Sequence, residues 1–131
     1  MNEHPNEKRL RDLFAAFSAR DVSTISDALA KDAVWHFPGK RGALAGSHVG
    51  HAGIFAFLAR VGELTEGTFE IDLEEILAND RSAVVFFRGR GKRLGRTLDN
   101  PTCLKIHFRG GLAAEFWEFV WDLDAVDEFW S

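Results

Sequence analysis

Several common features are absent or scarce in this 131-residue chain. It contains no tyrosine, so no mechanism that depends on a phenolic hydroxyl is open to it. Cys103 is the single cysteine, which excludes an intrachain disulfide and a cysteine-based zinc site. No apolar run approaches the roughly 18 residues of a membrane-spanning helix, and the polar start MNEHPNEKRL has no hydrophobic signal region. We therefore predict a cytoplasmic protein with no membrane partner.

Positive charge is also scarce. The chain has 16 Lys and Arg against 20 Asp and Glu, a net charge of −4 that gives no electrostatic reason to expect a nucleic-acid partner. The local exception is FRGRGKRLGR at 87–96, which lies between two strand-like runs and favours a hairpin face over a phosphate-binding patch. No P-loop or dinucleotide-binding glycine motif is found, so no nucleotide cofactor is predicted.

Apolar residues at helical spacing predict three helices. The first covers residues 6–20, the second follows Asp21, which is suited to cap it, and the third ends near Gly62. Their buried stripes are, in chain order, Leu10, Leu13, Phe14 and Phe17; Ile25, Ala28 and Leu29; and Ile54, Phe57, Leu58 and Val61. A strand-like run, AVWHF at 33–37, lies between the second and third helices and stops at the turn signal Pro38-Gly39.

From Thr68 onward apolar and polar residues alternate, as in strands that are buried on one side. The alternation slips between Leu73 and Ile76, which predicts a β-bulge. Turn signals at 79–80, 94–95 and 110–111 delimit further strands at 83–91, 97–109 and 112–121, and the tail DAVDEFW predicts a short helix. We predict one α+β domain over residues 1–131, with helices on one face of a curved antiparallel sheet.

Three segments match a known family: AAFSARDVSTISDALAKDAVWHFPG, GTFEIDLEEILAND and GGLAAEFWEFVWD. On these segments the chain resembles the nuclear transport factor 2-like superfamily, and within it the SnoaL-like, polyketide cyclase-related family. The resemblance implies a cone-shaped sheet, a cystatin-like roll, with three N-terminal helices over its concave face. Because this fold serves isomerases, hydrolases, dehydratases and non-catalytic binders, the resemblance leaves open whether the chain is an enzyme.

Two activities of the superfamily are not expected. Ketosteroid isomerases have an Asp base directly before the proline of the first strand and an oxyanion-binding Tyr on the first helix; here these positions hold Phe37 and Leu13. Limonene epoxide hydrolases pair their last-strand acid with an Arg-x-Asp element, and the nearest candidate, Arg88-Gly89-Arg90, lacks the Asp.

The last strand supplies the candidate acid. Similarity to the cyclases places Glu118 in the cavity, with Phe116 where they tend to have a histidine, and alternation puts Phe116, Glu118 and Val120 on one face. Apolar neighbours would raise the pKa of this carboxyl, which suits a general acid or base. The other interpretation is an ion pair with an arginine that only holds the sheet together.

The first strand supplies candidate residues for the wall of the pocket. Trp35 and Phe37 share the face that the resemblance directs at the cavity, and Leu13 and Phe17 of the first helix are expected to complete an apolar pocket with Phe116 and Val120. His36 points the other way unless the strand twists near Pro38. Because SnoaL-like cyclases often have a histidine two residues before this proline, His36 is a candidate catalytic residue, beside its interpretation as a structural imidazole.

The other histidines are less informative. A two-residue turn at Gly110-Gly111 would place His107 on the Glu118 face. A three-residue loop with a glycine bulge would place it outside and set Lys105 opposite Glu115; we favour this second arrangement. His48 and His51 are three residues apart, but no motif supplies a third ligand, so no metal is predicted.

We therefore expect a cofactor-free domain that binds a small hydrophobic molecule, cyclic or polyketide-like, and acts on it by proton transfer as an isomerase, cyclase or hydrolase. A non-catalytic ligand-binding or structural dimeric module is the alternative, and a neutralising Arg or Lys beside Glu118 would favour it. Trp117, Phe119 and Trp121 share the opposite strand face. Such an apolar surface predicts a homodimer in which Trp117 is buried between subunits.

Overall fold

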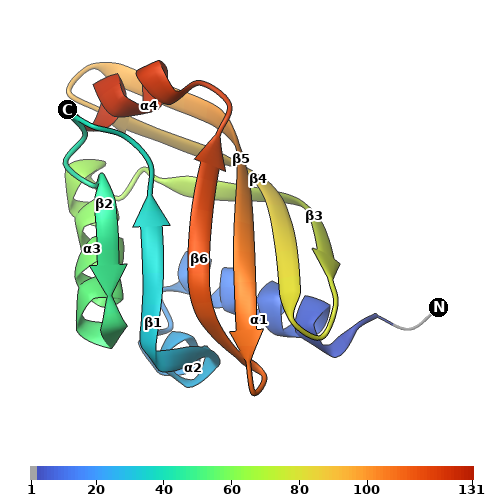
Figure 1. Cartoon of the computed structure of the whole chain (residues 1–131). Helices are drawn as coiled ribbons and strands as arrows, with labels where there is room; N and C mark the ends of the chain where they lie inside the picture. Colours follow the sequence, from blue (N-terminus) through green and yellow to red (C-terminus); the bar gives the residue numbers. More distant parts are fainter. Residues whose placement is uncertain (1–2) are drawn as a thin grey trace.

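Six strands form one curved sheet in the order β2-β1-β6-β5-β4-β3 (Figure 1). The computed structural model describes residues 3–131. The strands are β1 (Leu29–Phe37), β2 (Gly46–Val49), β3 (Glu70–Ala78), β4 (Ser82–Arg93), β5 (Arg96–Arg109) and β6 (Leu112–Val120). The helices are α1 (Pro5–Ala19), α2 (Val22–Ala28), α3 (Gly50–Leu64) and α4 (Leu123–Trp130). All neighbouring strands are antiparallel except β1 and β6, which run parallel.

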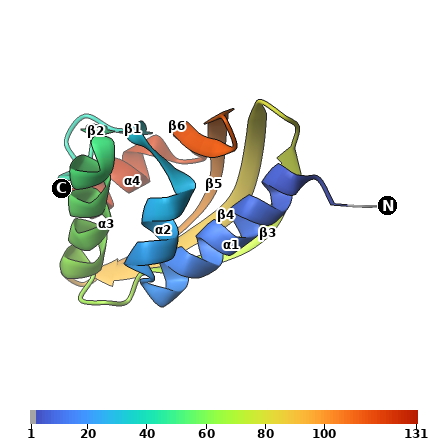
Figure 2. The ribbon, with the colours of Figure 1, turned by 90° about the horizontal axis from the view of Figure 1, so that it is seen from below.

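Helices α1, α2 and α3 cover the concave side of the sheet (Figure 2). Helix α1 contacts β3, whereas α3 contacts β1 and β2, so the two long helices lie over opposite edges of the sheet. The predicted α+β architecture, with three N-terminal helices over the concave face of a curved antiparallel sheet, is confirmed.

Local signals explain where the helices begin. Pro5 opens α1, where its missing N–H is not needed, and the His4 side chain accepts a hydrogen bond from the backbone N–H of Asn6. Arg20 ends this helix in the left-handed conformation, at φ 56°. The Asp21 carboxylate then accepts a hydrogen bond from the backbone N–H of Thr24 and caps α2, as predicted.

The sheet differs from the predicted one at its start. Strand β1 begins at Leu29, four residues before the predicted run, and Leu29 belongs to this strand rather than to α2. Strand β2 was not predicted, because its four residues, GSHV, are too few to show a period. The bulge predicted between Leu73 and Ile76 is present, since the pairing of β3 with β4 shifts there.

The turn between β5 and β6 has two residues. Arg109 pairs with Leu112 across Gly110 and Gly111, whose φ angles of 58° and 79° are those of a tight hairpin turn. A register shift follows at once: Phe108 pairs with Ala113 but His107 pairs with Glu115. The three-residue loop that we favoured is therefore wrong, and a bulge beside a two-residue turn sets the register instead.

That register decides which side chains face inward. Leu104 and Ile106 are fully buried on the helix side, and His107 is exposed on the outer side, as we expected. The predicted pairing of Lys105 with Glu115 is wrong, because Lys105 lies opposite Trp117. Its ammonium is 5.0 Å from the centroid of that indole, a cation–π contact on the outer face.

The basic segment at 87–96 forms the hairpin of β4 and β5. Arg88 and Arg90 form ion pairs of 3.1 Å with Asp99 and Asp72, respectively. Partners on neighbouring strands thus neutralise these two arginines, as expected for a hairpin face rather than a phosphate site. No helix in the described part of the chain is long and apolar enough to cross a membrane.

Candidate functional site

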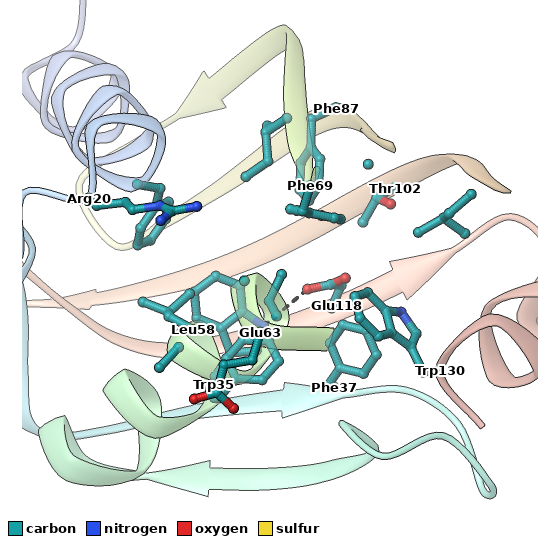
Figure 3. Close-up of a pocket in the computed structure, with 18 of the residues that line it drawn as sticks. Arg20, Trp35, Phe37, Leu58, Glu63, Phe69, Phe87, Thr102, Glu118 and Trp130 are labelled. Carbon is teal, nitrogen blue, oxygen red and sulfur yellow. Dashed lines mark hydrogen bonds between the residues drawn. The ribbon is translucent and has the colours of Figure 1, made fainter. Parts of the chain in front are cut away.

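A cavity of about 890 Å³ lies between the concave face of the sheet and the helices (Figure 3). Its walls come from all four helices and from the inner faces of all strands except β2. Most lining side chains are aromatic or aliphatic; among them are Phe17, Trp35, Phe37, Leu58, Phe69 and Trp130. Volume and composition are those of a site for a small hydrophobic molecule.

Glu118 lies in the wall of this cavity, on β6. The indole N–H of Trp35, on the neighbouring strand β1, donates a hydrogen bond of 3.1 Å to its Oε1. Every fully buried side-chain nitrogen and oxygen atom in residues 3–131 has a hydrogen-bond partner. The other carboxyl oxygen of Glu118 has none in the described chain, so it must be accessible from the cavity.

The electrostatic surroundings of Glu118 favour its neutral form. Burial raises the pKa of this carboxyl from 4.5 to about 7, and the hydrogen bond from Trp35 offsets part of the rise. Within residues 3–131 no Arg, Lys or His forms an ion pair with Glu118. The structure thus lacks the neutralising cation that a purely structural carboxylate would have, and the carboxyl is poised to exchange a proton near neutral pH.

Aromatic rings hold Trp35 in place beneath the carboxyl. Phe116 stacks on the indole, with ring centroids 4.5 Å apart and planes inclined by 12°. The rings of Phe57 and Phe17 pack against the same indole, with centroid distances of 5.4 and 5.9 Å. These contacts fix the direction of the N–H that reaches Glu118.

The predicted wall residues fall into two layers. Phe17, Trp35, Phe37 and Val120 line the cavity. Leu13 and Phe116 are buried behind this layer and support it without lining the cavity.

Two further polar side chains in the wall were not predicted. Asn100 and Thr102 belong to the inward face of β5, between the apolar residues Leu98 and Leu104. The one available signal was this pair of polar residues at inward positions of an otherwise apolar strand face. Asn100 is engaged at the end of β6: its Oδ1 accepts from the backbone N–H of Trp121 at 3.2 Å, and its amide donates to the backbone oxygen of Asp122.

Three charged residues lie at the cavity end formed by α1 and α3. Arg20 follows the end of α1, and Glu63 lies at the end of α3 (Figure 3). Glu66 belongs to the turn after α3. All three are exposed. In the described chain none of them forms an ion pair with another side chain. They form the solvent-exposed end of an otherwise apolar cavity.

The structure does not bring His36 and Glu118 together. His36 projects from the outer face of β1, where its Nε2 is 2.6 Å from the Glu115 carboxylate and its Nδ1 is 2.8 Å from the Ser47 hydroxyl. Its ring also stacks on Trp117, with centroids 5.8 Å apart. A role for His36 in proton transfer inside the cavity therefore has no support from its position, which fits the structural interpretation.

His48 and His51 have separate structural partners. The Nε2 of His48 lies 2.8 Å from the backbone oxygen of Leu44, and that of His51 lies 3.2 Å from the backbone oxygen of Leu29. No group of three or more His, Cys, Asp or Glu side chains in residues 3–131 is arranged to hold a metal ion.

The glycine-rich loop after β1 is held by a buried carboxylate of α4. Asp127 accepts hydrogen bonds from the backbone N–H groups of Lys40, Arg41 and Gly42, with shortest distances of 2.9, 3.0 and 2.8 Å. These bonds lower the pKa of Asp127 from its ordinary value, the bond from Lys40 most of all. The loop thereby joins β1 to α4, whose Val126 and Trp130 side chains close one end of the cavity.

Comparison with known proteins gives a consistent picture. The model of the SnoaL-like domain family matches residues 10–116. An uncharacterised protein of Mycobacterium tuberculosis is 32% identical over 123 residues, which cover 93% of each chain. The structure of Bal32a, from a soil-derived mobile gene cassette, is similar with a TM-score of 0.93 at 34% identity over 97% of both chains. TerC, co-crystallised with polyporic acid, is similar with a TM-score of 0.83 at 27% identity, over 96% of this chain and 98% of its own.

Proposed function

Because the chain belongs to the SnoaL-like domain family, we propose that it binds a hydrophobic cyclic molecule in the cavity and transfers a proton with Glu118. The observation that carries this proposal is a carboxyl in an apolar wall that forms no ion pair within residues 3–131. One of its oxygens accepts a hydrogen bond from Trp35, and the other is accessible from the cavity. The similar protein TerC was co-crystallised with polyporic acid, which supports a small molecule as the ligand of this chain.

The proposed chemistry needs only the two protonation states of Glu118. The ionised carboxylate takes a proton from a carbon next to a ligand carbonyl, and the electron pair of the C–H bond moves into an enolate. The protonated carboxyl then returns the proton to the same carbon or to another one. The reaction consumes no oxidant and no cofactor, and the pKa of about 7 leaves both forms of the carboxyl populated at neutral pH.

Deuterium exchange tests this proposal without knowledge of the natural substrate. Bicyclic ketones such as 1-tetralone are incubated with the protein in D₂O, and deuterium at the carbon beside the carbonyl is followed by NMR. We expect the wild type to accelerate exchange and Glu118→Gln to lower the rate by about a hundredfold. Glu115→Gln, on the outer face of the same strand, is the matched control and should keep the rate.

The second candidate function, a non-catalytic ligand-binding module, makes the opposite prediction. If the wild type binds these ketones and exchange is no faster than in buffer, the cavity serves binding alone. The lack of an ion pair at Glu118 favours the catalytic candidate, because a carboxyl kept only for structure gains stability from a cationic partner.

The outer face of the sheet supports a homodimer as the assembly. Phe119 and Trp121 are 57% and 85% exposed; the half-buried Trp117 shares the outer face of β6 with Phe119, and Trp121 follows the end of that strand. Helix α4 lies on the cavity side and leaves these residues uncovered. A second copy of the chain is the simplest cover for such a surface. A cytoplasmic location stays a prediction from the sequence.

A further inference from the structure

Thr102 is a polar residue of the cavity wall with hydrogen-bonding capacity to spare. It is buried, and its hydroxyl donates to the backbone oxygen of Asn100 at 3.3 Å. That distance is long for an O–H···O bond, which is usually about 2.7–2.8 Å. The hydroxyl can therefore rotate to a better acceptor at little cost.

The sheet register places Thr102 next to Glu118. Leu104 pairs with Glu118 across β5 and β6, and Thr102 pairs with Val120, so Thr102 and Glu118 are diagonal neighbours on one sheet face. Diagonal neighbours of this kind lie roughly 7–8 Å apart. Both side chains line the same cavity (Figure 3). A ligand in this part of the cavity therefore meets the hydroxyl and the carboxyl from the same side of the sheet.

We propose that Thr102 is a specificity-determining residue that donates a hydrogen bond to a carbonyl oxygen of the ligand, beside the carbon that exchanges its proton with Glu118. This inference rests on the proposed function and defines its substrate class: a hydrophobic ring system with a carbonyl next to an acidic C–H. When the C–H electron pair moves toward that oxygen, the Thr102 hydroxyl stabilises the negative charge that develops there. No tyrosine is needed for this role.

Four other polar residues of the cavity wall are less suited to the task. Both polar atoms of the Asn100 side chain contact the backbone around Trp121. Arg20, Glu63 and Glu66 lie at the exposed end. We therefore expect a ligand with a single oxygen to bind with that oxygen at Thr102.

A pair of matched probes tests the assignment. 1-Tetralone and tetralin have nearly the same bicyclic shape and differ by the carbonyl oxygen, and the affinity of each is measured for the wild type and for Thr102→Val. The ratio of the two affinities is compared between the proteins, because the hydration of the carbonyl cancels in that comparison. We expect the preference for 1-tetralone to fall by about fivefold to tenfold in Thr102→Val, the size of one hydrogen bond.

Two further variants complete the design. Thr102→Ser keeps the hydroxyl and should keep the preference, and Thr102→Ala should lose it even if the valine variant fails to fold. Thr65→Val removes a buried hydroxyl that lies outside the cavity wall, and it should leave the preference unchanged. If both probes bind and the valine and alanine variants keep the wild-type ratio, the assignment of Thr102 falls alone. If neither probe binds the wild type, the proposed function falls with it.

Discussion

The indole N–H of Trp35 donates a hydrogen bond to a carboxyl that lies 83 residues further along the chain, that of Glu118. The bond joins β1 to β6, the two strands that run parallel in the sheet. It holds one oxygen of Glu118 in the wall of the cavity while the other remains free. The bond thereby orients Glu118 for the proton exchange that we propose.

The first prediction concerns stability and pH. The pKa of Glu118 is raised from 4.5 to about 7 in the folded protein. The folded state therefore binds this proton more tightly than the unfolded state, and its stability falls as the pH rises from about 4.5 to about 7. At pH ~9 we expect the free energy of unfolding of Glu118→Gln to exceed that of the wild type by about 2–3 kcal/mol. At pH ~5 we expect the two free energies of unfolding to differ little.

Urea unfolding at the two pH values measures this difference. Glu115→Gln is the control, because it removes a carboxylate from the outer face of the same strand, where it contacts His36. This control variant should show no increase in the free energy of unfolding at alkaline pH. An equal effect of Glu118→Gln at both pH values would show that Glu118 does not change its protonation state in this range.

The second prediction concerns the donor. Trp35→Phe keeps an aromatic ring in the wall but removes the N–H that lowers the pKa of Glu118. The pKa of Glu118 should therefore rise further above its ordinary value, and the deuterium exchange described above should need a higher pH. Carbon-13 NMR titration of glutamate side chains measures the shift. Trp130→Phe, which alters another indole of the cavity wall, should leave the pKa of Glu118 unchanged.

Much of this site could be predicted because strands have a strict period of two. Once the last strand is recognised, alternation puts Glu118 on one face and Trp117 on the other. Trp35 and His36 are separated by the same rule, and the imidazole between two rings belongs to the face opposite them. Family resemblance then shows which face is the inner one.

The remaining features depend on contacts between distant residues. The bulge at 113–114 shifts the register by one residue, and no turn signal in the sequence distinguishes it from a longer loop. Thr102 becomes a candidate only when that register places it beside Glu118. The loop at 40–42 is held by Asp127, which lies 85–87 residues further along the chain, and no local pattern indicates that contact.

The third prediction concerns that loop. Asp127→Asn replaces a carboxylate that accepts three backbone N–H bonds by an amide with a single acceptor oxygen. We expect faster hydrogen exchange at the amides of residues 40–42 and a lower melting temperature. The folded-state pKa of Asp127 is lowered, so its contribution to stability is present at neutral pH and is lost in acid. Asp124→Asn, an exposed change in the same helix, should alter neither the hydrogen exchange of residues 40–42 nor the melting temperature.

The last prediction concerns assembly. Trp117 and Phe119 lie on the outer face of β6, and Trp121 follows the end of that strand. Helix α4 lies on the cavity side, and Phe119 and Trp121 are exposed. Trp121 is 85% exposed, so the apolar surface remains in contact with water unless a second copy covers it. A two-fold pair of these faces would bury the indole of Trp117 beside Lys105 and His36.

Light scattering at micromolar concentration measures the assembly directly. We expect a mass of twice 14.7 kDa for the wild type and a shift toward the single mass for Trp117→Lys, which places a charge in the middle of the paired faces. Leu94→Lys makes the same kind of change at the exposed tip of the β4–β5 hairpin and should leave the dimer intact. A wild type that scatters as a 14.7 kDa monomer would contradict the homodimer and leave this apolar face to a different partner.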